Sequence, residues 1–156
     1  LEEPPAGARL LLSCSDLERL LPTVRSRCQL LALPPPAPEQ AAAWLQAQGV
    51  ADAAALLAAC GGGPLDALAL QRAGIDAARW QALPKALALG QTAAVAGWPL
   101  ARTLDALQKL CHDLLAAAAG APPRYFAAAA LPVPRGGIAP LLDWAEALRR
   151  VARHAE

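Results

Sequence analysis

Apolar residues recur every three or four positions along most of the chain, which is the spacing of one face of an α-helix. The clearest pattern extends from Pro99 to Gly120. Its apolar positions are Leu100, Leu104, Leu107, Cys111, Leu114 and Leu115. A second pattern extends from Pro140 to Ala155, and its apolar positions are Leu141, Trp144, Leu148 and Val151. Both patterns predict long amphipathic helices, and a short helix is expected between them over residues 124–130.

Shorter helices are predicted before these two. Prolines stand where helices can begin and glycines where they can end, so we expect a three-helix unit with spans 39–48, 52–60 and 64–74. Leu65, Leu68 and Arg72 are expected to share one face of the third helix. Asp76 can cap a further helix, which Pro84 should kink or divide.

The first 33 residues have a different pattern. Two short apolar runs, RLLLS at 9–13 and QLLAL at 29–33, are bounded by turn residues and favour buried strands, although short helices satisfy the same pattern. Between them, Asp16 is placed to cap a helix that Pro22 should end. The arrangement of short apolar runs and turn residues in this part is therefore typical of an α/β structure.

Composition agrees with a mainly helical protein. The 156 residues include 41 Ala and 29 Leu but only six aromatic residues, and Ala and Leu favour helices over sheets. The net charge of +1 excludes a strongly basic nucleic-acid-binding surface, and no apolar run reaches the roughly 18–20 residues of a membrane span. The N-terminal residues have no basic region typical of a signal peptide, so a cytoplasmic protein without a membrane partner is expected.

No complete catalytic or metal site is expected from the motifs. The four cysteines have no paired spacing typical of zinc, and Gly61–Gly63 lack the lysine of a phosphate-binding loop, which favours a helix end. Cys111 falls on the apolar stripe and His112 off it, so a core thiol and a surface imidazole are predicted. Lys109 and Asp113, four residues apart, are predicted to form a solvated pair.

The sequence Ser26-Arg27-Cys28 stands out because packing does not explain an arginine at the start of an expected buried strand. A guanidinium makes rigid bidentate contacts with carboxylates and phosphates. A specific anionic partner for Arg27 is one alternative, and a role without such a partner is the other.

Around these residues the sequence resembles the clamp-loader subunits of the AAA+ class. The resemblance covers about 30 residues, from LEEPP through RLLLS and the Asp16 segment to TVRSRC. Two later stretches, LLAACGGGPLDALAL and LLDWAEALRRVARHAE, are similar more loosely. The resemblance implies three parts: a remnant of the AAA+ core with two strands at 1–33, a helical lid at 34–75, and a helical collar lacking its last helix at 76–156.

In this family the arginine of the motif is an arginine finger, so the resemblance implies that Arg27 contacts ATP bound to a neighbouring subunit. Ser26 and Cys28 would position it, with Cys28 buried. Leu65 occupies the position at which ATP-binding relatives have an arginine, which implies that this chain binds no cofactor and hydrolyses no ATP itself. The family's sheet also has a strand between the two apolar runs that this sequence lacks, so residues 1–33 are expected to be poorly supported.

The implied function is that of a non-catalytic clamp-loader subunit of a bacterial replicative DNA polymerase holoenzyme, in the cytoplasm. The implied partners are the γ/τ and δ subunits, contacted through the collar. The sliding clamp and primer–template DNA would be contacted only within the complex. Two alternatives stay open at this point: a γ/τ-type ATPase subunit, and a helical adaptor unrelated to replication.

Overall fold

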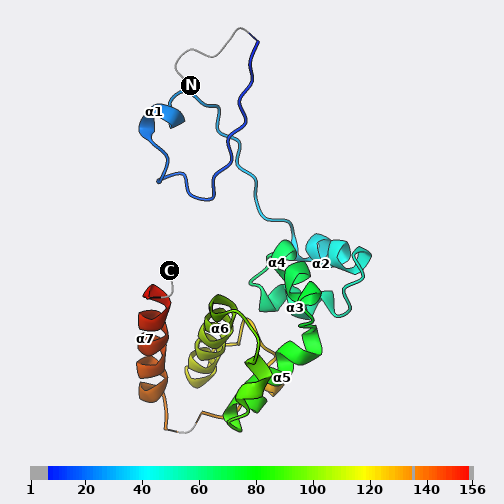
Figure 1. Ribbon diagram of the computed structural model, residues 1–156, viewed down its shortest axis with the longest axis vertical. Helices are drawn as coiled ribbons and strands as arrows, with labels where there is room; N and C mark the ends of the chain where they lie inside the picture. Colours follow the sequence, from blue (N-terminus) through cyan, green and yellow to red (C-terminus); the bar gives the residue numbers. More distant parts are fainter. Residues whose placement is uncertain (1–6, 135, 155–156) are drawn as a thin grey trace. The chain divides into compact units, whose positions relative to one another are not determined.

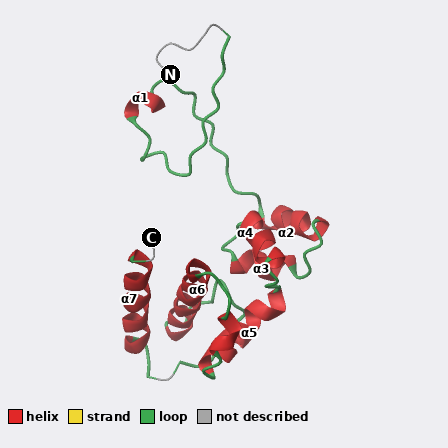
Figure 2. Cartoon of the chain, viewed as in Figure 1, coloured by secondary structure: helices red, strands yellow, loops and turns green. Residues whose placement is uncertain are grey.

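The computed structural model describes residues 7–134 and 136–154 and divides the chain into two compact units. The first unit ends at Pro35, and the second begins at Pro36 (Figure 1). The described residues form seven α-helices and two short 3-10 helices, and none of them is in a β-strand (Figure 2). The mainly helical class predicted from the sequence is therefore confirmed.

The two strands predicted in the first unit are absent. Residues 9–13 and 29–33 are irregular, and their leucines lie in solvent, with Leu11 99% and Leu33 84% exposed. A strand requires a neighbouring strand for its backbone hydrogen bonds, and the described residues offer none. This exposure agrees with the expectation that the segment is poorly supported.

The helix predicted from Asp16 is also wrong. The Asp16 carboxylate accepts a hydrogen bond from the Glu18 N–H at 2.9 Å, which forms a local turn instead of a helix cap. The single helix among the described residues of this unit, α1 (Pro22–Arg25), starts at the proline that was expected to end one. Proline suits the first position of a helix because its missing N–H would have no partner there.

The second unit opens with three helices: α2 (Pro38–Ala47), α3 (Ala53–Ala59) and α4 (Pro64–Arg72). Their spans follow the predicted ones closely. Gly61 ends α3 in the left-handed conformation that favours glycine, with φ of 64°, and Gly62 donates its N–H back to the Leu57 carbonyl at 2.9 Å. The buried residues of α4 are Ala67 and Leu70, whereas Leu68 packs partly against the core and Leu65 is 71% exposed.

Helix α5 (Ala77–Ala88) begins where it was predicted. The Asp76 carboxylate accepts the N–H of Arg79 at 2.7 Å, and Trp80 and Leu83 are buried. Pro84 lies inside the helix without dividing it. The 3-10 helix η1 (Thr92–Val95) then leads to α6 (Leu100–Ala118), the longest helix among the described residues.

Helices α6 and α7 (Ala139–Arg153) lie side by side (Figure 1). Leu104 and Cys111 of α6 pack with Leu148 of α7, as their spacing predicted. The predicted end of the last helix at Ala155 lies outside the described residues. The short helix expected at residues 124–130 is reduced to the 3-10 turn η2 (Ala128–Ala130).

One hydrophobic core extends through most of the second unit. It contains Leu45 of α2, Leu56 of α3, Trp80 of α5 and Leu114 of α6. No single helix in the described part of the chain has the length and apolar character to cross a membrane. Helices α3 and α4 taken together have the length and composition of a membrane span, but they meet at a bend of 105°.

Candidate functional site

The three residues of the predicted motif lie in a tight turn that directly follows α1. Their N–H groups donate to carbonyls of the preceding turn: Ser26 to Pro22 at 3.0 Å, Arg27 to Val24 at 3.2 Å and Cys28 to Arg25 at 3.4 Å. The Ser26 hydroxyl also donates to the Thr23 carbonyl at 3.2 Å. Ser26 thus bonds within the backbone turn that carries Arg27.

The surroundings of the motif differ from the expectation at one position. Arg27 is exposed, as a residue that contacts another molecule has to be. Cys28 was expected to be buried and is exposed instead. Its burial required a strand packed into a sheet, and that strand does not form in the described residues.

Leu65 occupies the first turn of α4, immediately after the glycines that end α3. Its aliphatic side chain is 71% exposed and offers no hydrogen-bond donor to a phosphate. Among the described residues, no group of three or more His, Cys, Asp or Glu side chains could hold a metal ion.

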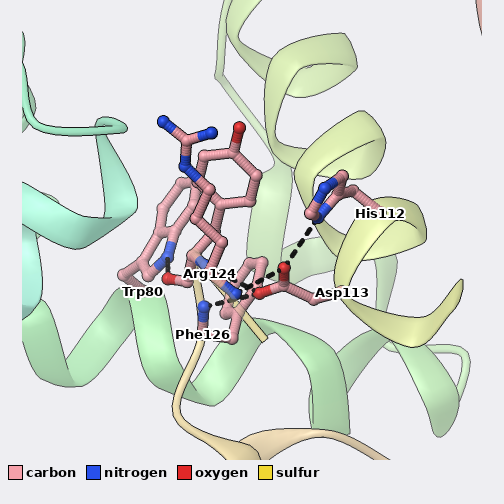
Figure 3. A network of polar contacts seen from close by, with 6 residues as sticks. Trp80, His112, Asp113, Arg124 and Phe126 are labelled. Atoms are coloured by element: carbon pink, nitrogen blue, oxygen red, sulfur yellow. Dashed lines mark hydrogen bonds and ion pairs between the residues drawn. The ribbon is translucent and has the colours of Figure 1, made fainter. Parts of the chain in front are cut away.

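One aspartate of the second unit was predicted to lie in solvent and has different surroundings in the structure. Asp113 of α6 is fully buried, and its carboxylate accepts three consecutive backbone N–H bonds (Figure 3). Arg124 donates to Oδ1 at 2.9 Å, while Tyr125 and Phe126 donate to Oδ2 at 2.7 and 2.8 Å. Buried carboxylates persist where hydrogen bonds compensate the lost hydration, as these do.

The predicted Lys109–Asp113 pair is therefore wrong. Lys109 pairs one turn earlier, with Asp105 at 2.6 Å. Beside the buried carboxylate is His112, whose Nδ1 lies 3.0 Å from Asp113 Oδ1 and whose ring is half exposed. His112 is thus a surface imidazole and Cys111 a buried thiol, as predicted.

Aromatic side chains surround the same loop. The Trp80 indole N–H donates to the Tyr125 carbonyl at 3.1 Å, and its ring stacks on Phe126 with centroids 5.0 Å apart (Figure 3). Lys109 and Arg124 place their cationic groups 5.6 and 5.4 Å from the Tyr125 ring centroid. These contacts hold residues 124–126, which follow α6 in the chain, against α5 and α6.

Cys60, at the end of α3, provides a test of burial in this region. Burial raises the pKa of its thiol to about 11, and the positive charge of Lys109 partly offsets the increase. At pH 8 only about 0.1% of such a thiol is ionised. We expect iodoacetamide to alkylate the exposed Cys14 and Cys28 while Cys60 stays unmodified, as read by peptide mass spectrometry.

The alkylation rate of Cys60 should rise about tenfold per pH unit up to its pKa. Unfolding returns the thiol to its ordinary pKa of 9.0. The stability that this group contributes is therefore complete below pH 9 and declines as the pH rises toward 11. Equal labelling of Cys60 and Cys28 at pH 8 would contradict this description.

Comparison with known proteins places the motif in a family context. A family described as "DNA polymerase III, delta subunit" matches residues 1–37, which contain Ser26, Arg27 and Cys28. The resemblance found in the sequence around this motif is therefore supported by an independent match to the same polymerase.

The individual relatives are delta-prime subunits of DNA polymerase III. The subunit of Escherichia coli (strain K12) is 44% identical over 85 residues, which is 53% of this chain and 24% of the relative. The subunit of Pseudomonas aeruginosa (strain PAO1) is 41% identical over 86 residues, 52% of this chain and 26% of the relative. The resemblance to a clamp-loader subunit is thus confirmed, and the relatives specify it as a resemblance to delta-prime subunits. The chain matches about a quarter of the length of these relatives, and no solved structure matches it.

Proposed function

We propose that this chain acts in a clamp loader of bacterial DNA replication as part of a delta-prime-type subunit. The observation that carries the proposal is the identity of 41–44% to delta-prime subunits of DNA polymerase III, together with the family match over the Ser26-Arg27-Cys28 motif. The bacterial cytoplasm is the corresponding location.

Within that role, we propose that Arg27 acts in trans as an arginine finger. The guanidinium would contact the γ-phosphate of ATP on the neighbouring subunit and offset negative charge that develops during phosphoryl transfer. Its exposure and its position on a hydrogen-bonded turn support this role, because an arginine finger must project from a defined backbone. Ser26 supports the turn through its bond to the Thr23 carbonyl.

The chain itself is proposed to have no ATPase activity. Leu65 stands where the ATP-binding members of the family have an arginine, and an aliphatic side chain cannot compensate phosphate charge. This difference favours a non-catalytic subunit over a γ/τ-type ATPase subunit.

The helices that follow the lid are proposed to contact the γ/τ and δ subunits. On α7, Leu142 is 52% and Val151 47% exposed, although Leu148 of the same helix packs on α6. Half-exposed apolar residues on a helix suit burial against a neighbouring subunit. The sliding clamp and primer–template DNA would be contacted only within the assembled complex.

Reconstitution of the full-length protein with the ATPase and δ subunits tests the proposed function. We expect clamp loading on primed DNA to require this protein, and we expect the isolated full-length protein to bind no ATP in equilibrium dialysis. Clamp loading that proceeds equally well without it would overturn the proposed role. ATP hydrolysis by the isolated protein would favour the γ/τ-type alternative.

A further inference from the structure

A short loop in the second unit contacts helices that belong to two predicted domains. Residues 124–127, which we call the strap, follow α6 and pass across its buried side. The backbone N–H groups of the first three residues donate to the Asp113 carboxylate of α6 at 2.7–2.9 Å. The N–H of Ala127 donates to the side-chain oxygen of Gln81 of α5 at 2.8 Å. Four consecutive donors thus fix the strap to both helices.

Two side chains of the strap, those of Arg124 and Tyr125, lie near the three-helix unit. A Cβ placed on Gly61, at the end of α3, would lie 3.7 Å from Cε1 of Tyr125 and 3.9 Å from Nη2 of Arg124. Tyr125 and the neighbouring Cys60 both pack against the common hydrophobic core. The ring of Tyr125 therefore lies between α3 and α6, with the Lys109 ammonium 5.6 Å from its centroid.

The junction between the predicted domains has no features of a flexible linker. It was placed at residues 75 and 76, where Ile75 is fully buried and Asp76 caps α5 through the Arg79 N–H. Trp80 of α5 belongs to the same core as Leu45 of α2 and Leu56 of α3. A single core without an exposed linker favours cooperative opening over independent domain motion.

From these contacts we propose that the strap is a latch that makes helices α2–α6 one rigid body. Its backbone holds α5 and α6, and the Tyr125 ring holds the end of α3. The three-helix lid is then unable to move relative to α5 and α6 unless the strap is released. This inference does not depend on the proposed role in clamp loading.

Hydrogen exchange of the full chain, followed by NMR or mass spectrometry at increasing urea, tests the latch. We expect core amides of α3, such as Leu57, and of α6, such as Leu114, to open with the same free energy and the same urea dependence. Different opening free energies and urea slopes for the two helices in the wild-type protein would overturn the proposal.

Tyr125→Ala removes the ring but leaves the backbone donors to Asp113. We expect α3 amides to exchange at least tenfold faster in this variant, while α6 amides change much less. Tyr125→Phe keeps the ring and should exchange like the wild-type protein. Equal acceleration in α3 and α6, or no acceleration in α3, would show that Tyr125 does not couple them. If Tyr125→Ala fails to fold, the wild-type comparison decides alone.

Discussion

Asp113→Ala is expected to lower the free energy of unfolding of the second unit by more than about 4 kcal/mol, among the largest losses a single substitution causes. The carboxylate is fully buried and accepts the N–H groups of Arg124, Tyr125 and Phe126. Each donor left without a partner costs about 1–3 kcal/mol, and bonds to a charged acceptor are at the upper end of the range. The removed carboxylate also leaves a cavity.

Asp113→Asn is the more informative variant because it keeps the volume and removes the charge. An amide oxygen can accept the bonds from Tyr125 and Phe126, but the amide nitrogen then faces the Arg124 N–H, donor against donor. We expect a loss of about 2–3 kcal/mol. Urea denaturation followed by tryptophan fluorescence measures it, since Trp80 stacks on Phe126 within the same network.

Asp143→Asn on α7 is the matched control, because this aspartate is exposed. Its effect should stay within about 0.5 kcal/mol, as for most surface substitutions. A loss for Asp113→Asn no larger than that of the control would mean that the three hydrogen bonds to Asp113 do not stabilise the fold.

The helices of the second unit could be predicted because their information is local. Proline in the first turn of α2 and α4, Asp76 before α5 and glycines with positive φ after the helices all act through neighbouring residues. The three- and four-residue spacing of α6 likewise follows from the helical repeat. The boundaries of these helices were therefore predicted within a few residues.

The first unit was predicted wrongly for the opposite reason, because the formation of a strand depends on residues outside the run. An apolar run such as residues 9–13 becomes a strand only where another segment provides backbone partners. The described residues provide none, and Leu11 is 99% exposed. The apolar pattern of these two runs shows that each can form a strand beside a partner. Whether a partner is present cannot be inferred from the run itself.

Asp113 shows a third limit. Its spacing from Lys109 was compatible with a surface pair, and the decisive partners are backbone groups eleven to thirteen residues later, which have no sequence signature. One signal was available: Asp113 follows Ala106 by seven residues and Leu110 by three, and both are buried. A carboxylate on the buried face of a helix predicts an internal partner. The stripe predicted from the sequence includes the buried Leu104, Cys111 and Leu114 but omits the buried side that carries Ala106, Leu110 and Asp113.

The largest functional effect is expected for Arg27→Ala in the full-length protein reconstituted with the ATPase subunits proposed as its partners. Arginine fingers contribute about three to five orders of magnitude to phosphoryl transfer in comparable enzymes. We therefore expect DNA-stimulated ATP hydrolysis at the neighbouring site to fall by about a thousandfold or more. Arg27→Lys should restore little, because a single ammonium lacks the bidentate geometry of a guanidinium.

Arg25→Ala separates a finger from a general loss of positive charge. Arg25 lies two residues earlier, is also exposed, and ends α1. Its substitution removes the same charge from the same turn, so hydrolysis should stay near the wild-type rate if Arg27 alone contacts the phosphate. ATP affinity, measured with a non-hydrolysable analogue, should change far less than the rate, since the finger stabilises mainly the transition state. Unchanged turnover in Arg27→Ala, or an equal loss in both variants, would mean that Arg27 takes no part in the reaction. The positive charge of this turn would then serve assembly.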